Sequence, residues 1–282
     1  SKPSTRVLVL STLKMKAIGA ALLLFLAGCF AQQTTRHGGC HPEDEACVFP
    51  VDGAEFLIGG LFDLRVEVHR EMGRPDHHEV TVTKDAGEPV SAAEFFGVEP
   101  EFGDEYTFEY VEDLTEDATI YEMTSNAEVY YNVTFTEPGE YKVTVSTDRG
   151  PVEVLYEVLA GPGKQADNVI FFIGDGMQQG MISAARLISR GQQHGFSQGD
   201  LYLDTMPGIG LQRTSGVDSI ITDSANSASS FNTGHKSSVN ALGVYADTTS
   251  DTLDDPKVET LAERAKRELG KCVGIVTNSE IQ

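Results

Sequence analysis

The strongest constraint on the fold is a change in sequence pattern at the linker formed by residues 161–165, Gly-Pro-Gly-Lys-Gln. Before this linker, short runs alternate apolar with polar residues, and turn residues separate the runs. Such runs predict half-buried antiparallel strands. After the linker, apolar strand-like runs alternate with helical patterns, which predicts an α/β architecture. The chain is therefore expected to form two domains, a small all-β sandwich over residues 51–160 and an α/β domain over residues 161–282.

The β half is predicted from three alternating segments, residues 64–69, 80–83 and 127–133. A Pro-Gly turn at Pro138 leads into a further strand pattern, and residues 135–145 resemble the late strands of immunoglobulin-like sandwiches. We therefore expect the sandwich to be of the immunoglobulin-like type.

In the α/β half, residues 168–173 form a continuous apolar run that is typical of a strand buried on both faces. Residues 178–190 carry small and apolar residues at helical spacing, and a second helix is predicted over residues 254–269 because an acidic cap, an early proline and a terminal glycine agree in direction. A last buried strand is expected over residues 272–277, with Cys272 as a small buried hydrophobe.

The first 29 residues have the pattern of a signal peptide. Lys14 and Lys16 precede an apolar run, residues 17–27, which is too short to span a bilayer. The run ends in Leu-Ala-Gly-Cys, which resembles the bacterial lipobox, in which the cysteine, here Cys29, becomes lipidated. We expect an exported, membrane-anchored lipoprotein that faces the periplasm or the cell surface. An ordinary signal peptide with an incidental cysteine is the alternative.

Residues 30–50 are expected to form a tether between the anchor and the sandwich. Because an exported chain can form disulfides, Cys40 and Cys47 are expected to close a small loop. Two free thiols in a flexible tether are the alternative.

Acidic residues are concentrated in the middle of the chain. Residues 41–160 carry 29 acidic and six basic side chains, whereas the whole chain has a net charge of −22. A surface this acidic repels nucleic acid, so we expect no nucleic-acid partner. It leaves open a calcium-binding module in which the acidic pairs at residues 112–113 and 116–117 meet. A solvated acidic surface is the simpler interpretation of these pairs.

Two motifs in the α/β half place groups where phosphoryl chemistry needs them. Asp175 lies in a Gly-Asp-Gly turn directly after residues 168–173, so its carboxylate is expected at the carboxyl end of a strand, where open α/β sheets bind ligands. Asp223 and Ser224 precede a helix of small residues, so the Ser224 hydroxyl is expected beside unpaired backbone N–H groups. Each motif alone has a simpler interpretation, a polar turn residue or a helix N-cap. Their joint occurrence favours a phosphoryl-transfer site.

Ser224 can attack phosphorus only if its hydroxyl loses its proton. A bound zinc ion lowers the pKa of a coordinated oxygen by several units. No Gly-x-Ser-x-Gly elbow surrounds Ser224, and no His-Asp pair is identifiable as its triad partners. A metal-activated serine is therefore expected in place of a catalytic triad.

At these residues the sequence resembles the alkaline phosphatase family, and the resemblance covers residues 168–282. Besides the two motifs, it includes Thr-Gly-His-Lys at residues 233–236, Asn-Ala-Leu-Gly-Val at residues 240–244 and the closing segment at residues 274–281. The resemblance implies an alkaline-phosphatase-like three-layer α/β sandwich, incomplete in this chain. It also implies hydrolysis of small phosphate monoesters with Zn2+ and Mg2+ as cofactors.

The same resemblance implies a role for each motif residue. Ser224 would be transiently phosphorylated and would bind one zinc ion, Asp175 would ligate zinc and magnesium, and Asp223 would help to orient a phosphate-binding arginine. His235 and Lys236 are candidates for further metal ligands, but a polar helix end with cations near the C-terminal end of the helix dipole is the simpler interpretation of this pair. A homodimer is a further expectation.

The sequence departs from the family pattern in two ways. Gln178 stands where many relatives have glycine, and the remaining metal ligands and the phosphate-binding arginine have no counterpart up to Gln282. We therefore expect the amino-terminal part of a longer enzyme, with little activity, weak zinc binding and a tendency to aggregate by itself. The rival functions are a phosphodiesterase or sulfatase on the same metal scaffold, and a surface lipoprotein binding module with a degenerate phosphatase remainder.

Overall fold

The computed structural model describes residues 45–70, 78–111, 120–163 and 166–278. The predictions for the signal peptide, for Cys29 and Cys40, and for the acidic pairs at residues 112–113 and 116–117 lie outside these ranges. Within the described ranges, no helix has the length and apolar character needed to cross a membrane.

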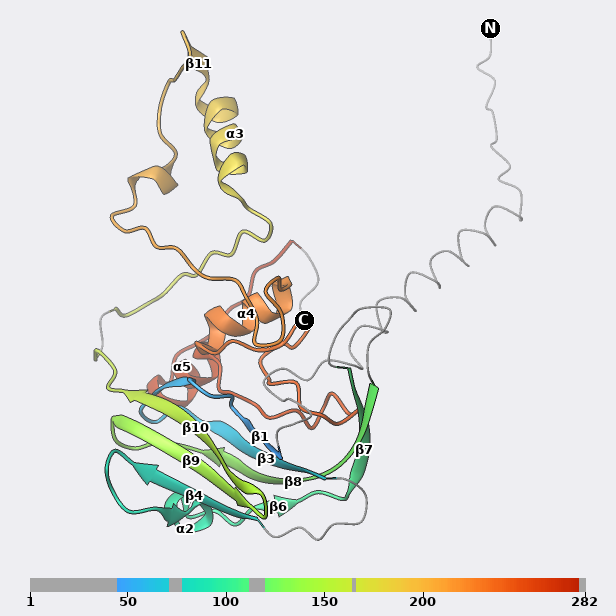
Figure 1. The fold of residues 1–282 in the computed structure, drawn as a ribbon. Coiled ribbons are helices and arrows are strands. Elements are labelled where there is room, and N and C mark those ends of the chain that lie inside the picture. Colours follow the sequence, from blue (N-terminus) through green and yellow to red (C-terminus); the bar gives the residue numbers. More distant parts are fainter. Residues whose placement is uncertain (1–44, 71–77, 112–119, 164–165, 279–282) are drawn as a thin grey trace, which may run out of the picture.

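Figure 1 shows a β-rich body with two helices, α4 (Ser224–Thr233) and α5 (Leu261–Leu269), lying on one side of it. The third long helix, α3 (Gln179–Arg190), projects away from this body. The described chain is therefore a mixed α/β structure in which the segment that carries α4 contacts the β-rich part.

Two five-stranded sheets form the β-rich body. The first has the strand order β1-β3-β8-β6, with β7 also paired to β8, and all its pairs are antiparallel. The second has the order β2-β10-β9-β4-β5, in which β2 is parallel to β10 and the other pairs are antiparallel. The strands are β1 (Ala46–Phe49), β2 (Glu55–Leu57), β3 (Phe62–Arg70), β4 (Glu79–Lys84), β5 (Val90–Ser91), β6 (Glu101–Phe102), β7 (Tyr106–Val111), β8 (Ile120–Val133), β9 (Gly139–Thr147) and β10 (Gly150–Leu159).

Apolar residues from both sheets meet in one core. Strand β3 contributes Leu64 and Val66, strand β9 contributes Val143 and Val145, and all four side chains are fully buried. Because successive side chains of a strand point to opposite faces, a period-two pattern places these residues on one face. The alternating segments predicted from the sequence are present as β3, β4, β8 and β9.

A tyrosine fixes the turn that precedes β9. The Tyr141 hydroxyl donates to the carbonyl oxygen of Glu137 at 2.9 Å, and its buried ring lies 4.3 Å from that of Phe135, measured between centroids. Immunoglobulin-like sandwiches contain a comparable tyrosine corner. The assignment of this sandwich to that type stays a prediction.

The sandwich begins earlier than the sequence predicted. Residues 46–49, which were assigned to the tether, form β1, pair with β3 and are buried. Their sequence, Ala-Cys-Val-Phe, is apolar, so pairing along the edge of β3 removes apolar surface from water. Cys47 is disulfide-bonded, and its predicted partner Cys40 lies outside the described residues.

The two strands predicted for the α/β half are not formed. Residues 168–173 and 272–277 have no strand pairing, Phe172 is 84% exposed, and Val276 is fully exposed. A parallel strand needs neighbours that bond its backbone and helices that cover its faces. In the part of the chain that the structure describes, no strand lies beside either segment. Cys272, predicted to be buried, is exposed for the same reason.

The helices agree better with the sequence. Helix α3 confirms the helix predicted over residues 178–190, and α4 begins where the small-residue helix was expected. The prediction for α5 was wrong at its start, because Thr260 and Glu263 form a capping box and the helix begins at Leu261. It ends, as predicted, at Gly270. Four short elements complete the described chain: α2 (Ala92–Phe96), β11 (Gln192–Gln193), β12 (Phe196–Ser197) and η1 (Tyr202–Thr205).

Candidate functional site

Ser224 is the first residue of α4 and is exposed. Asp223 caps the helix, because its carboxylate Oδ1 accepts a hydrogen bond from the backbone N–H of Asn226 at 3.1 Å. The capping role thus belongs to Asp223, and the Ser224 hydroxyl lies at the positive end of the helix without having to cap it. This is a position at which an anion such as phosphate is favoured.

Asp223 also holds the loop that follows the helix. Its Oδ1 accepts from the backbone N–H of Asn240 at 3.2 Å, and Asn240 has a positive φ of 67°, a conformation that asparagine adopts more readily than most residues. One carboxylate therefore ties the first turn of α4 to the loop at residues 235–243. The predicted role of Asp223 in orienting an arginine stays a prediction.

The buried face of α4 is polar. Asn226 and Ser229 are both buried, and both bond to the following loop. The side-chain oxygen of Asn226 accepts from the Ser237 N–H at 2.8 Å. The Ser229 hydroxyl lies 2.9 Å from the Ala241 carbonyl oxygen and accepts from the Gly243 N–H at 2.7 Å. Since an unpaired buried polar group costs about 1–3 kcal/mol, these bonds fix the loop to the helix.

Asp175 lies in an exposed turn, as its motif predicted, but the described residues directly before it, 166–174, form no strand. The turn is closed by the Met177 N–H, which donates to the Gly174 carbonyl oxygen at 3.1 Å. The apolar segment before the turn reaches α4 through Phe171, whose ring lies 5.6 Å from that of Phe231. The structure thus brings this segment to the helix, while the convergence of the Asp175 carboxylate with Ser224 stays a prediction.

The predicted metal ligands supply only part of a donor set. Asp175 and Ser224 offer oxygen atoms, which suit magnesium and zinc. Across the described ranges, no three His, Cys, Asp or Glu side chains gather in a way that could hold a metal ion. Lys236 is engaged elsewhere, because its Nζ donates to the Ser215 hydroxyl at 2.9 Å. The two oxygen donors fit part of a metal site, which would need further ligands because zinc sites have at least three.

A second group of polar residues, which sequence reasoning missed, lies on the outer face of β3. Asp63, Arg65, Glu67 and His69 alternate with the apolar core residues and are 5%, 4%, 0% and 4% exposed. The outer face of an antiparallel sheet commonly meets water. Here residues 247–259 contact it, so β3 is buried on both faces.

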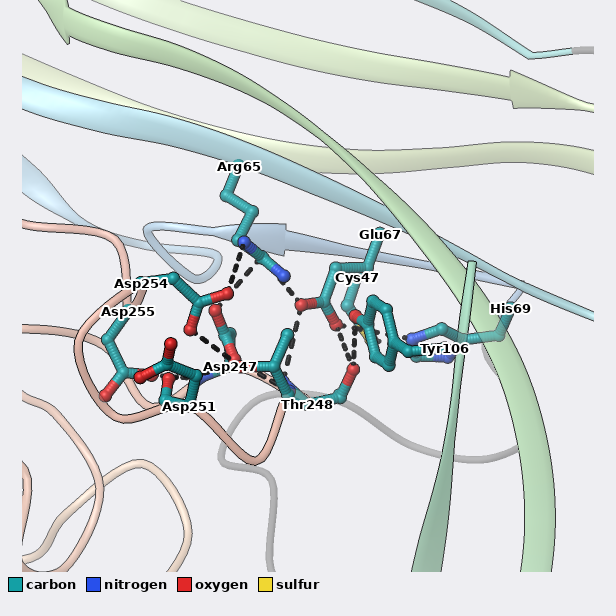
Figure 2. A network of polar contacts seen from close by, with 11 residues as sticks. Cys47, Arg65, Glu67, His69, Tyr106, Asp247, Thr248, Asp251, Asp254 and Asp255 are labelled. Carbon is teal, nitrogen blue, oxygen red and sulfur yellow. Dashed lines mark hydrogen bonds and ion pairs between the residues drawn. The ribbon is translucent and has the colours of Figure 1, made fainter. Parts of the chain in front are cut away.

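Figure 2 shows the centre of this interface. The Nε of Arg65 lies 2.8 Å from Glu67 Oε1 and 3.2 Å from Asp247 Oδ2. The Thr248 hydroxyl donates to Glu67 Oε2 at 2.7 Å and lies 2.8 Å from the Tyr106 hydroxyl. An ion pair and a charged hydrogen bond therefore join strand β3 to residues that follow the candidate nucleophile helix.

The buried carboxyl groups of this interface have pKa values shifted in opposite directions. Burial raises the pKa of Asp247, and the charge of Glu67 raises it further. Burial also raises the pKa of Asp255, to about 6. Burial would raise the pKa of Glu67 as well, but the hydrogen bond from His69 and the charge of Arg65 outweigh it and lower the pKa to about 2. Arg65 therefore faces a permanent anion at Glu67, whereas Asp247 keeps its proton to a higher pH than an ordinary aspartate.

His235 belongs to the same interface. Its buried ring lies 4.8 Å from the ring of Phe56 in an edge-on arrangement, and its Nδ1 lies 3.1 Å from the Tyr245 hydroxyl. Burial lowers the pKa of His235 to about 4, so the ring is neutral at neutral pH. The interpretation of His235 as part of a polar, cationic helix end is therefore wrong, because the sandwich covers it.

The sequence contained a signal for this interface. Four ionisable side chains of both signs occupy one face of a single strand, Asp63 to His69, in a segment that is otherwise a core strand. Charges of both signs at that spacing fit a face that pairs with another part of the chain, although a solvated face has the same alternation. The partner at residues 247–248 could not be inferred, because 181 positions separate Thr248 from Glu67.

Comparison with known proteins adds the family of this segment. Residues 166–282 match the family model described as Alkaline phosphatase, and residues 45–154 match the one described as PhoA-like N-terminal domain. The resemblance predicted over residues 168–282 is thereby confirmed. A solved titin M10 and obscurin-like 1 immunoglobulin complex aligns with 42% of this chain at 15% identity, but its TM-score of 0.21 is too low to assign the type of the sandwich.

Three relatives illustrate the match. Alkaline phosphatase 4 of Drosophila melanogaster is 37% identical over 121 residues, which are 42% of this chain and 20% of that protein. The tissue-nonspecific isozyme of Gallus gallus is 34% identical over 41% of this chain and 23% of its own length. The membrane-bound alkaline phosphatase of Bombyx mori is 34% identical over 41% of this chain and 22% of its own. The chain thus spans about a fifth to a quarter of the length of these relatives.

Replacing His235 by Phe is expected to make folding less sensitive to acid. The folded-state pKa of His235, about 4, lies below the ordinary value of 6.5, so the unfolded state binds more protons between these two pH values. The stability that His235 contributes is therefore complete above about pH 6.5 and is lost as the pH falls through about 4. Urea unfolding followed by circular dichroism from pH 4 to pH 7 measures this loss.

The matched control is His194→Asn, which changes an exposed histidine and suits the positive φ of 51° at that position. This control should lose stability on the acid side as the unsubstituted protein does. Equal acid sensitivity in His235→Phe and the unsubstituted protein would contradict a buried, neutral His235.

Proposed function

We propose that residues 166–282, which match the alkaline phosphatase family, form part of an enzyme that hydrolyses phosphate monoesters through a phosphoserine intermediate at Ser224. The observation that carries the proposal is the exposed serine at the first position of α4 within the matched segment. Asp223 caps this helix, which leaves the Ser224 hydroxyl for chemistry. The positive end of α4 would stabilise both the bound phosphate and the developing alkoxide.

We propose Asp175 and Ser224 as ligands for zinc and magnesium. Asp175 suits this role because its turn is exposed, and Ser224 suits it because it stands at the start of α4. When bound, the metal ions supply a Lewis acid and lower the pKa of the attacking hydroxyl. Asp223, whose Oδ1 is used in the cap, would orient a phosphate-binding arginine through its remaining oxygen.

Cellular placement is also a proposal. The lipobox at Cys29 supports an exported lipoprotein anchored to a membrane, and one relative is named a membrane-bound alkaline phosphatase. The sandwich would then lie between the anchor and the catalytic segment. Small phosphate esters are the proposed substrates, and a homodimer is the proposed assembly.

Replacing Ser224 by Ala is expected to lower kcat for p-nitrophenyl phosphate by on the order of 10³-fold or more, since the nucleophile is removed. The measurement uses the protein that contains this chain together with its complete catalytic domain, in zinc and magnesium. Acid quenching followed by peptide mass spectrometry should locate a phosphate on Ser224 in the unsubstituted enzyme.

Ser230→Ala is the matched control, because that hydroxyl lies on the same helix and donates to the Asn226 carbonyl oxygen at 3.1 Å. It should keep activity close to that of the unsubstituted enzyme. Undiminished turnover in Ser224→Ala would refute the assigned nucleophile. Faster hydrolysis of a phosphate diester or a sulfate ester than of the monoester would replace the proposed reaction by one of its rivals.

Replacing Asp223 by Asn is expected to separate folding from phosphate binding. Asparagine caps helices as well as aspartate does, so the thermal unfolding temperature should change little. The carboxylate that would orient an arginine is lost, so inorganic phosphate should inhibit the variant more weakly, by about tenfold, as expected for loss of one hydrogen bond between charged groups. Inhibition as strong as in the unsubstituted enzyme would limit Asp223 to its cap.

A further inference from the structure

We propose that Arg65 and Glu67 of the β-sandwich are positioning residues for α4, the helix that begins with Ser224, and that they act through residues 243–259. The inference rests on the role proposed above for Ser224. The sandwich would then not only separate the anchor from the catalytic segment but also hold the nucleophile helix in place.

The first step of the path is backbone pairing at the edge of β3. The Asp63 N–H donates to the Lys257 carbonyl oxygen at 2.9 Å, and the Glu259 N–H donates to the Leu61 carbonyl oxygen at 2.9 Å. The Asp63 carboxylate also accepts from the Lys257 N–H at 3.1 Å. Residues 257–259 therefore extend the first sheet beside β3.

The second step leads from this segment to α4. The Tyr245 N–H donates to the Pro256 carbonyl oxygen at 3.0 Å, and the Val258 N–H donates to the Gly243 carbonyl oxygen at 3.4 Å. The Gly243 N–H in turn donates to the hydroxyl of Ser229, a buried residue of α4, at 2.7 Å. An unbroken set of hydrogen bonds thus joins β3 to the helix.

The buried charges fix where this segment docks. Glu67 accepts from both the hydroxyl and the backbone N–H of Thr248, at 2.7 and 3.3 Å, and Arg65 pairs with Asp247 at 3.2 Å. Glu67 can accept both hydrogen bonds from Thr248 only when the loop occupies one position. A displaced loop would remove the Thr248 donors from Glu67 and separate Asp247 from Arg65, which is unfavourable for buried charges. The network in Figure 2 therefore selects one placement of residues 247–248.

The far end of α4 is attached to the sandwich directly. His235 follows the C-cap of the helix and packs on Phe56 of β2. Its partner Tyr245 shares a small buried cluster with Phe49 of β1 and with Val258. The helix is thus held at its C-terminal end by aromatic contacts and along its buried face by the loop that Arg65 and Glu67 anchor.

The test is hydrogen–deuterium exchange with mass spectrometry on the 282-residue chain. Thr248→Val removes the hydroxyl that bonds Glu67 while keeping the shape of the side chain. We expect peptides within residues 224–248 to exchange on the order of tenfold faster, because a buried charged acceptor loses one of its donors. Peptides of β9 and β10 should exchange as before.

Two further variants complete the design. Thr248→Ser keeps the hydroxyl and should restore slow exchange in α4. Arg264→Ala removes a different contact to the sandwich, the 2.6 Å bond to the Ile58 carbonyl oxygen, which lies off the path to α4 and should leave α4 unchanged. Unaltered exchange in α4 of Thr248→Val would overturn the proposal, and so would an equal acceleration in β9 and β10.

A kinetic measurement separates this inference from the proposed function. In the protein with its complete catalytic domain, Thr248→Val should lower kcat for p-nitrophenyl phosphate severalfold with little change in KM, and Thr248→Ser should restore it. If α4 responds by exchange but Ser224→Ala leaves turnover unchanged, the helix is anchored as described and the role of Ser224 fails. If α4 does not respond, the positioning role fails whatever the activity.

Discussion

The pairing of Arg65 and Glu67 on the outer face of β3 is the interaction on which the rest of the described structure depends. A carboxylate with no exposure to water is tolerated only when it is fully hydrogen-bonded and paired. Thr248, which donates to Glu67, and Asp247, which pairs with Arg65, both come from the segment that follows the candidate nucleophile helix. The sandwich and that segment therefore stabilise each other, because one face of β3 packs in the sandwich core and its other face contacts the segment.

The position of helix α4 depends on this contact between β3 and the loop. Its buried residues are Asn226 and Ser229, so its buried face carries no apolar stripe. Hydrogen bonds to the loop hold this face, and these are directional. The position of Ser224 is then only as well defined as the position of the loop, which the charges on β3 determine. A polar interface of this kind specifies a placement more than it adds stability.

The sequence predicted what depends on local pattern. Alternation predicted the strands of the sandwich, and residue type predicted the stop at Gly270. Residue type left the cap of α4 open between Asp223 and Ser224, and the structure selects Asp223. The sequence failed where distant partners decide. The apolar run at residues 168–173 was predicted as a buried strand, yet the described chain places no strand beside it. The polar face of β3 was visible as mixed charge, but nothing local to it points to a partner 181 residues away.

A double-mutant cycle between Glu67 and Thr248 tests the central claim most directly. The free energies of unfolding of the 282-residue chain, of Glu67→Ala, of Thr248→Val and of the double variant would be measured by urea denaturation. The account predicts that the loss of stability in the double variant is smaller than the sum of the two single losses, by about 1 kcal/mol or more, because the two side chains interact directly. Additivity within about 0.3–0.5 kcal/mol would contradict it.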